Sequence, residues 1–463
     1  MKRSLIMLLS AILTVAMIFS LAACAPTVDE GKDPVADIPA DDNNVVTPDV
    51  DEPLPEVGEL ITPNVGTASD SNVNEEPAPA PLVDPTPATE GLKFQLNDEK
   101  TAYYVFRYTG TASVVYVPFA YNGLPVVEIG YRAFDGAVLT SVTLPDTIEY
   151  INQYAFRGTT LASIEIPASV TNIADLAFMD NPNLASITVD ESNPNYRVVS
   201  GCLVKGDTVV LGCKSSTIPT DADITAIGSG AFRGSGIEIV NIPSNIVKFG
   251  RGIFVGCTSL RYAGFYDTIA LIEDGMFTNC SSLANVVIPD SVTYIGARSF
   301  QGCSSLTEMV IPSNVVTVGQ YAFENSGLTS VTMKEGVTTI GGAAFKNCSR
   351  LISVVVPDSV VTIGASAFWE CRSLSDISLG VSSASRLIEI GGGSFYNCSA
   401  LKMIFIPKTV TQIGASTFQG CTYSSTDEAG VTTVFTVYCE SSGYLNASSF
   451  LCGAKALYKQ TRP

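Results

Sequence analysis

The 463-residue sequence contains no histidine and a single tryptophan. Without histidine the chain has neither the commonest general base nor the Ser-His and Cys-His pairs that activate nucleophiles in many enzymes. The same absence excludes zinc and haem sites that use histidine ligands. We therefore expect no enzymatic activity and no cofactor.

Positive charge is also scarce. The chain has 26 Lys and Arg against 45 Asp and Glu, and its formal net charge is -19. Residues 25–90 hold 16 of the acidic residues and one basic residue, Lys32. No part of the chain offers the basic stripe that a phosphate backbone requires. We therefore expect no nucleic-acid partner.

The first residues have the pattern of an export signal. Lys2 and Arg3 precede an apolar run that ends at Leu21, as in a secretory signal peptide. The tetrad Leu-Ala-Ala-Cys at 21–24 resembles a bacterial lipobox, in which processing leaves the cysteine as the lipidated N-terminus. We expect a lipoprotein signal peptide at 1–23 with lipid attachment at Cys24. An uncleaved anchor that spans the membrane is the alternative.

Residues 24–90 combine the acidic residues with 12 prolines. Such a segment buries too little apolar surface to offset the entropy that it would lose on folding. We expect an acidic, proline-rich, disordered tether that holds the remainder of the chain away from the membrane.

Beyond residue 90 the sequence repeats itself. The stretch LANVVIPDSVTYIGARSFQGC at 283–303 is followed by the closely similar SLTEMVIPSNVVTVGQYAFENS. One phenylalanine returns every 22 or 23 residues, except between Phe178 and Phe232 and between Phe368 and Phe395. Such a period is typical of a solenoid of stacked coils. The repeat phenylalanines are Phe134, Phe156, Phe178, Phe232, Phe254, Phe277, Phe300, Phe323, Phe345, Phe368, Phe395 and Phe418.

Within one repeat, the alternation of apolar residues predicts a short strand. Val286 and Ile288 share its inward face, and Pro289 ends it because proline lacks an amide donor. Gly296 is expected to permit a tight bend, and Phe300 fills the core opposite the strand. One coil buries only about six large side chains, too few to offset its backbone entropy, so the coils must stack.

The same pattern gives the domain boundaries. We predict an N-terminal cap and first coil at 91–130, a solenoid at 131–425 and a C-terminal cap at 426–463. A long coil at 190–223 is expected to carry a hairpin, because two apolar runs flank Lys205-Gly206-Asp207. A turn centred on Gly206-Asp207 would pair Cys202 with Leu211.

The pattern L-x-x-V-x-I-P-x-S-V-T-x-I-G-x-x-A-F-x-x-C over residues 105–421 resembles the BspA-type, or Treponema-type, leucine-rich repeat. This resemblance implies a mainly β fold, a right-handed β-solenoid with coils of about 22–23 residues. It also implies display on a bacterial surface, where many family members act in adhesion. It brings no catalytic residues.

Seven cysteines each follow a repeat phenylalanine by three residues, and Ser326 has the same place in another coil. Stacked side chains that point the same way leave their β-carbons too far apart for ordinary disulfides. We predict a column of small buried thiols, with a ladder for a soft metal as the alternative. The sequence does not decide whether Cys202 and Cys213 form a disulfide bridge, nor does it give the redox state of Cys439 and Cys452. The column cysteines are Cys257, Cys280, Cys303, Cys348, Cys371, Cys398 and Cys421.

Outward positions of the strands hold the candidate site. Glu308 and Asp376 lie three coils apart there, hence ~14 Å at strand spacing, which is too far for a glycosidase pair. Apolar groups at outward positions predict an interface, although the β-propensity of exposed strands is an equal explanation. The candidate ligand-binding residues are Tyr262, Val287, Val310, Val355, Met403 and Phe405.

These patterns predict a secreted protein that is lipid-anchored to the outer face of a bacterial membrane and displayed at the cell surface. Its solenoid would bind an extracellular protein or glycan of a host or a neighbouring cell. A structural spacer or envelope scaffold without a ligand is the alternative, and an enzyme ranks third. The ligand, the oligomeric state and the source organism do not follow from the sequence.

Overall fold

The computed structural model describes residues 82, 84, 86–380, 384–427 and 432–439, and the backbone of 455–458. The predicted signal peptide, Cys24, most of the predicted tether and Cys452 lie outside these residues. In the described ranges every regular element is a β-strand, so the expected mainly β fold is confirmed. No helix in these ranges has the length and apolar character needed to cross a membrane.

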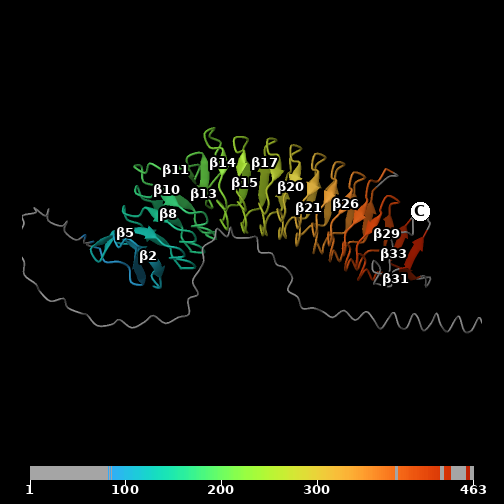
Figure 1. Ribbon diagram of the computed structural model, residues 1–463, viewed down its shortest axis with the longest axis horizontal. Helices are drawn as coiled ribbons and strands as arrows, with labels where there is room; N and C mark the ends of the chain where they lie inside the picture. The colour runs from blue at the N-terminus through green and yellow to red at the C-terminus, as the bar shows by residue number, and fades with distance from the viewer. Residues whose placement is uncertain are drawn as a thin grey trace, which may run out of the picture. The chain divides into compact units, whose positions relative to one another are not determined.

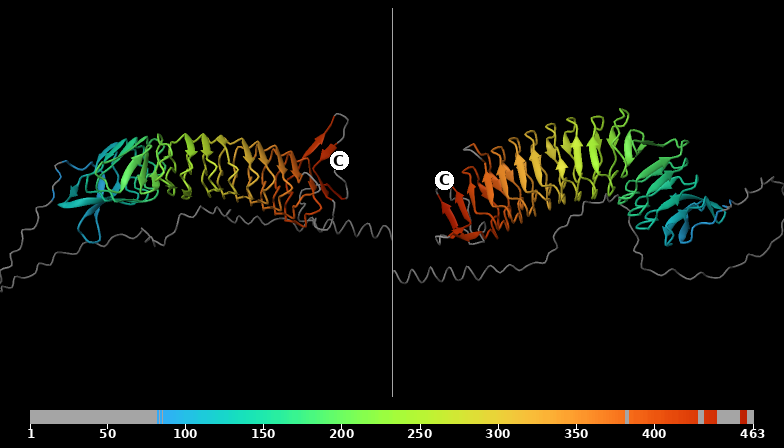
Figure 2. Two further views of the ribbon diagram at one scale, coloured as in Figure 1. Left: turned by 90° about the horizontal axis from the view of Figure 1, so that it is seen from above. Right: turned by 180° about the vertical axis from the view of Figure 1, so that it is seen from behind.

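Residues Ala78–Pro463 form one compact unit, a stack of about 13 coils of about 23 residues. Figure 1 shows the coils side by side in chain order, and Figure 2 shows the same stack from two other sides. A regular coil contributes one strand of four residues and one of two, and successive coils pair these strands in parallel. The predicted repeat solenoid is therefore confirmed.

The longer strands form what we call the long-strand face, in five groups of paired strands. The groups are β3 (Val114–Tyr116) with β6 (Ser141–Thr143); β8 (Ser163–Ile166) with β10 (Ser186–Val189); β15 (Ile239–Ile242), β17 (Tyr262–Phe265) and β19 (Asn285–Val286); β21 (Glu308–Ile311), β23 (Ser330–Met333), β25 (Ser353–Val356) and β27 (Asp376–Leu379); and β29 (Met403–Ile406), β33 (Thr436–Cys439) and β34 (Lys455–Tyr458).

The two-residue strands form a second, short-strand face, whose longest sheet has seven strands. That sheet contains β18 (Leu271–Ile272), β20 (Tyr294–Ile295), β22 (Thr317–Val318), β24 (Thr339–Ile340), β26 (Thr362–Ile363), β28 (Glu389–Ile390) and β30 (Gln412–Ile413). Further towards the N-terminus lie β7 (Tyr150–Ile151), β9 (Asn172–Ile173), β14 (Ala226–Ile227) and β16 (Lys248–Phe249).

An antiparallel pair covers the N-terminal end of the short-strand face. β1 (Leu92–Leu96) pairs with β2 (Tyr103–Tyr108), which runs parallel to β5 (Leu124–Ile129), and β4 (Ala120–Tyr121) is antiparallel to β5. β5 then pairs with β7, so this hairpin protects an edge that would otherwise be open.

At the other end, β31 (Ser424–Thr426) and β32 (Thr432–Val434) form a small antiparallel pair. Within the segment that we assigned to the C-terminal cap, β33 pairs in parallel with β29. The Phe435 ring lies 5.9 Å from that of Phe418. The stacked core thus extends to Phe435, which sequence analysis missed because its spacing from Phe418 is shorter than the repeat.

The repeat phenylalanines form the centre of the core. From Phe277 to Phe418 consecutive ring centroids lie 5.2–5.8 Å apart, with interplanar angles of 4–12°. The residues two before and two after each phenylalanine turn the chain, many of them with positive φ, such as Asn279 at 60° and Asn347 at 58°. Glycine and asparagine tolerate this conformation best, which explains the recurrent Asn-Cys-Ser.

The chain does turn directly after Gly296, where the Ser299 amide donates to the Gly296 oxygen at 3.4 Å, but the bend is not what requires glycine here. Gly296 is not among the glycines with positive φ. A Cβ at this position would instead lie 2.6 Å from the carbonyl carbon of Glu273 in the preceding coil, and one on Gly319 would lie 2.6 Å from the backbone of Gly296. Glycine is needed here because the backbones of neighbouring coils approach each other too closely for a side chain.

The long coil contains β11 (Tyr196–Val199), β12 (Cys202–Lys205) and β13 (Thr208–Leu211), so the hairpin around Gly206 is confirmed. The predicted pairing of Cys202 with Leu211 is wrong. A bulge between Leu203 and Val204 shifts the register by one residue, which places Leu203 opposite Leu211. Cys202 instead pairs with Val199 of β11.

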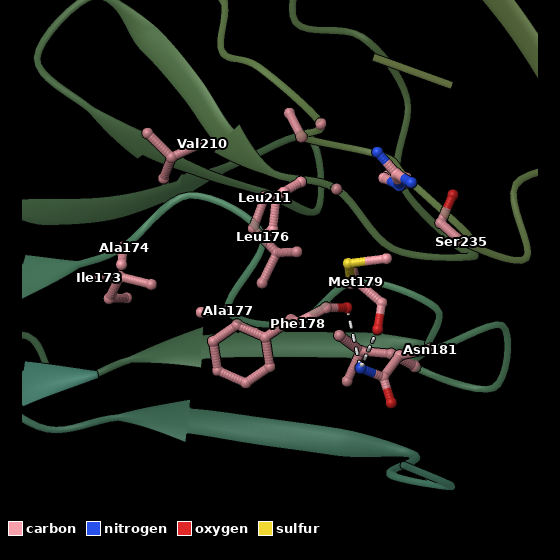
Figure 3. A pocket seen from close by; sticks show the side chains of 15 residues that line it. Ile173, Ala174, Leu176, Ala177, Phe178, Met179, Asn181, Val210, Leu211 and Ser235 are labelled. Carbon is pink, nitrogen blue, oxygen red and sulfur yellow. Dashed lines mark hydrogen bonds between the residues drawn. The ribbon is translucent and has the colours of Figure 1, made fainter. Parts of the chain in front are cut away.

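This hairpin lies between two hydrophobic cores. Leu203 and Leu211 belong to the N-terminal core, whereas Val204 and Val209 belong to the C-terminal core. In the described part of the chain no ring contact joins Phe178 to Phe232. Figure 3 shows a pocket at this interruption, lined by Leu176, Phe178 and Leu211 among others. The hairpin therefore separates two stretches of continuous stacking.

Candidate binding surface

The long-strand face carries the predicted binding surface. Four of the six candidate side chains are exposed there, namely Val287 by 62%, Val310 by 53%, Val355 by 49% and Met403 by 46%. The residue that follows each of them along the chain, such as Ile311 or Val356, is buried because side chains alternate along a strand. These four apolar side chains are thus accessible to a partner.

Tyr262 and Phe405 are half-buried. The Tyr262 ring runs along its own strand, since a Cβ on Gly264 would lie 2.8 Å from the Tyr262 hydroxyl oxygen and 3.0 Å from its Cε1. Phe405 lies opposite Tyr438 in the parallel pair of β29 and β33. Both aromatic candidates expose a smaller fraction of their surface than the four aliphatic ones.

The register decides which candidates lie together. Val310 is opposite Thr332, and Thr332 is opposite Val355, so these three side chains form one row across β21, β23 and β25. Val287 directly follows β19 in the coil before this row. Met403 lies beyond β27, whose outward residues are polar. The structure therefore brings the valines together and leaves Met403 apart from them.

Ile352 is a further exposed residue of this face that the sequence did not predict; it is 54% exposed and directly precedes β25. The alternation of inward and outward positions begins only at Ser353, which is also exposed. Because the chain is still turning at Ile352, the period of two gives no signal there. Ile239, opposite Tyr262, is a further exposed residue of this face, at 56%.

The predicted separation of Glu308 and Asp376 is confirmed by the register. Glu308 is opposite Ser330, Ser330 is opposite Ser353, and Ser353 is opposite Asp376, which makes three strand spacings. Among the described residues, no group of three or more Cys, Asp and Glu side chains is placed to hold a metal ion. The face presents apolar groups and separate carboxylates.

The predicted column of buried thiols is confirmed, because all seven side chains are buried. The hydrogen-bond partners of these thiols do not follow from the repeat spacing. Each sulfur donates to the backbone oxygen of the repeat phenylalanine one coil earlier, at 3.0–3.3 Å. That oxygen also accepts a backbone amide in its own coil, as from Cys280 to Phe277 at 3.1 Å. The thiols therefore join successive coils.

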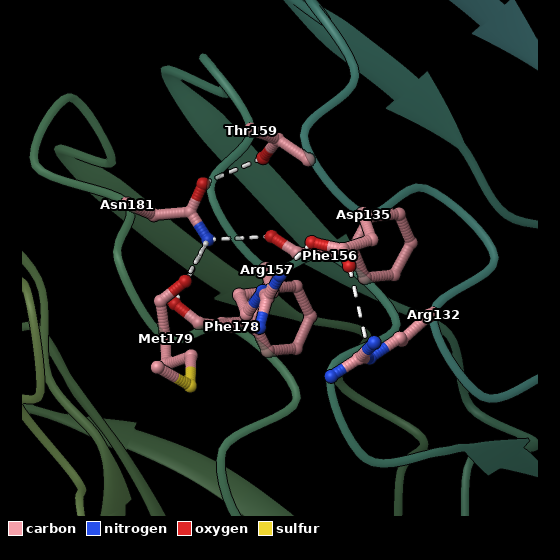
Figure 4. A network of polar contacts seen from close by, with 8 residues as sticks. All are labelled: Arg132, Asp135, Phe156, Arg157, Thr159, Phe178, Met179 and Asn181. Atoms are coloured by element: carbon pink, nitrogen blue, oxygen red, sulfur yellow. Dashed lines mark hydrogen bonds and ion pairs between the residues drawn. The ribbon is translucent and has the colours of Figure 1, made fainter. Parts of the chain in front are cut away.

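Asn181 has the corresponding role in the N-terminal coils, as Figure 4 shows. Its Nδ2 donates to the backbone oxygens of Phe156, at 2.7 Å, and Phe178, at 2.8 Å. Thr159, one coil earlier, donates to Asn181 Oδ1 at 2.6 Å. The position three residues after the phenylalanine is thus a donor position, which different coils fill with Cys, Asn or Thr.

Burial keeps the thiols of Cys303, Cys348 and Cys371 neutral. It raises the pKa of Cys303 and Cys348 from 9.0 to about 12, and that of Cys371 well above its usual range. The thiolate is the nucleophilic and metal-binding form of cysteine, so these groups are chemically inert in the folded state.

The bridge between Cys202 and Cys213 that the sequence left open is not formed, because both thiols are free and buried. Cys202 donates to the backbone oxygen of Thr217 at 3.4 Å. The Ser216 hydroxyl lies 3.3 Å from Cys213 Sγ and donates to the Gly201 oxygen at 2.7 Å. The two cysteines thus hold the long coil through separate contacts.

Replacing Cys303 with alanine should lower the free energy of unfolding by about 1–2 kcal/mol at pH 7, since a hydrogen bond and packing volume are lost. The raised pKa makes this difference depend on pH. The native thiol stays protonated up to about pH 12, whereas the unfolded thiol ionises from about pH 9.

The free energy of unfolding of the native chain should therefore fall by about 1.4 kcal/mol per pH unit between pH 9 and 12 because of this thiol. The Cys303→Ala chain should not show this contribution. Urea unfolding at pH 7, 8, 9, 10 and 11 measures the free energy of unfolding of both chains. The difference between their free energies of unfolding should be constant to pH 8, shrink above pH 9 and change sign by pH 11. A difference that stays constant to pH 11 would contradict the role assigned to burial.

Several solved structures of bacterial leucine-rich repeat proteins are similar to this chain. A leucine-rich cell surface protein from Faecalibacterium prausnitzii is 25% identical, with 73% of this chain and 93% of that chain covered and a TM-score of 0.42. A leucine-rich repeat protein from Eubacterium ventriosum is 20% identical, with 74% and 97% covered and a TM-score of 0.42. The pneumococcal vaccine antigen PcpA is 16% identical, with 80% and 98% covered and a TM-score of 0.38.

No curated protein matches the chain. The family description "BspA type Leucine rich repeat region (6 copies)" does match, over residues 103–200, 208–328 and 317–436. These ranges cover most of the chain and include most of both cores and of the long-strand face. The chain belongs to the BspA-type leucine-rich repeat family.

Proposed function

We propose that this chain is a secreted bacterial lipoprotein, anchored through Cys24 to the outer face of the membrane. Its long-strand face binds a protein or a glycan of a host or a neighbouring cell. The acidic segment 24–90 is the tether that gives this face reach beyond the membrane. Neither a cofactor nor a catalytic step is part of this function.

The observation that carries the proposal is a set of exposed valines on the long-strand face, Val310 and Val355 in the row across β21 to β25 and Val287 in the coil before it, which we call the valine row. Val287, Val310 and Val355 are each about half exposed or more, on coils whose inward positions are closely packed. Burying one such side chain in an interface contributes roughly 1.5 kcal/mol. Membership of a leucine-rich repeat family supports interaction with another macromolecule, because stacked coils build extended binding surfaces.

The proposal predicts that charge within the valine row abolishes binding and leaves the fold intact. The chain from residue 25 to 463 is applied to immobilised extracellular-matrix proteins, cell-surface glycans and neighbouring-cell proteins. The double variant Val310→Asp/Val355→Asp should lose saturable binding by at least roughly a hundredfold, since two apolar contacts become buried charges.

Val316→Asp is the matched control, because Val316 lies in the same repeat as Val310, is 48% exposed and directly precedes β22 of the short-strand face. It should bind like the native chain. Equal loss in the control would assign the effect to folding. Saturable binding that survives the double variant would exclude the valine row, and no binding to any surface would favour a spacer or scaffold.

Lipid attachment has a separate test. Cys24→Ser removes the sulfur that the lipid would modify, so metabolic labelling with a radioactive fatty acid should fall to background. The protein should then move from the membrane fraction to the soluble fraction. Ala25→Ser serves as the control, since it changes the neighbouring residue and keeps the thiol. Unchanged labelling of the Cys24→Ser chain would refute the lipobox interpretation.

A further inference from the structure

We propose that the long-strand face between β17 and β27 docks a cationic amphipathic helix of a partner protein, with apolar residues on one side and Lys or Arg beside them. This inference rests on the proposed function and names the chemical class of the partner. It follows from the carboxylates that border the valine row and from the spacing of the coils.

Acidic side chains lie on both sides of the valine row. Glu308 and Asp376 occupy the first outward position of their strands, one outward position before the row. Others follow the strand ends, in the turns on the opposite side of the row. Lys334 and, in the turn after β27, Arg386 are the basic residues of these turns. The carboxylates are Asp267, Asp290, Glu308, Glu335, Asp358 and Asp376, and all except the half-buried Asp358 are exposed.

Most of these carboxylates have no cation beside them. Within the described residues, Asp267, Asp290, Glu308 and Asp376 take part in no ion pair. Glu335 accepts hydrogen bonds from the backbone amides of Asp358 and Ser359, both at 3.0 Å. Because these donors are neutral, its negative charge remains in the turns beside the valine row. Within the four-stranded sheet, the residue paired with Glu308 is Ser330 and the residue paired with Asp376 is Ser353, neither of which is a cation.

The same stack does pair charges between adjacent coils elsewhere. Arg157 lies 2.7 Å from Asp135, and Lys346 lies 3.4 Å from Glu324. Coil spacing therefore allows such pairs, and the long-strand face lacks them between β17 and β27. Its carboxylates repel one another and attract cations from outside the chain. A partner with Lys or Arg on both sides of an apolar stripe fits this arrangement.

The spacing of the coils favours a helix that lies across the strands. Successive side chains of the row are one strand spacing apart, ~4.8 Å. Apolar residues on one face of an α-helix recur every three or four positions, hence ~5.3 Å along its axis. A helix along the stack can thus place one apolar side chain on each coil, with flanking Lys or Arg over the carboxylates.

A fluorescent peptide tests this inference. The probe is a helical peptide of about 14 residues, or ~21 Å, with leucine on one face and lysine elsewhere. Its counterpart has glutamate in place of lysine. Fluorescence anisotropy measures binding of each to the chain from residue 25 to 463. The leucine-lysine peptide should bind at least roughly a hundredfold more tightly than the counterpart.

Two variants separate docking from simple charge attraction. Val310→Asp adds a negative charge, so mere attraction of a cationic peptide would strengthen, whereas docking should weaken roughly tenfold. Asp376→Lys should also weaken binding. Its matched control is Glu389→Lys, an exposed residue of β28 on the short-strand face of the same coil. The acidic segment 25–90 contributes equally in every variant, so the comparison isolates the face.

Tighter or unchanged binding in Val310→Asp would overturn the inference, as would equal effects of Asp376→Lys and Glu389→Lys. Equal binding of the two peptides would also overturn the inference. It would leave the proposed function intact, because a protein or glycan whose binding is abolished by Val310→Asp/Val355→Asp could still bind at the valine row. The proposed function itself would fail if the native chain bound no protein or glycan, or if the double variant bound as tightly as the native chain.

Discussion

The stacking of each coil on its neighbours is the interaction on which the rest of the structure depends. One coil of about 23 residues cannot offset its own backbone entropy. Three contacts join neighbours: the ladders of two parallel faces, the ring-on-ring column from Phe277 to Phe418, and the thiol bonds to the phenylalanine oxygens. At stacked glycines such as Gly296 and Gly319, the backbones of neighbouring coils are so close that even a methyl group does not fit.

This constraint divides the residues of each coil into two kinds. Those that stack, such as Ile311, Phe323 and Cys348, are buried and recur because every coil needs them. Those that face outward on the long strands, such as Glu308 and Val310, differ from coil to coil because stacking does not restrict them. The apolar row and its border of carboxylates are therefore not dictated by stacking and can encode a partner.

The period of the sequence was sufficient to predict the solenoid, the buried thiols and the outward position of Val310 and Val355, because one side-chain periodicity governs all of them. Details that break the period were not predictable. The bulge at Leu203 depends on local backbone geometry, Ile352 lies where the chain is still turning, and Phe435 follows a shortened interval. The donor role of the thiols required contacts between coils, which spacing within one coil does not reveal.

Hydrogen exchange in a Phe323→Ala chain tests the dependence on stacking most directly. This change opens the phenylalanine column at one coil, between Phe300 and Phe345. Amides of β20, β22 and β24 should lose most protection, and the loss should decline coil by coil in both directions. Protection in β5 and β7, in the core beyond the hairpin, should be unchanged. A loss confined to the coil of Phe323, or equal throughout both cores, would contradict the account.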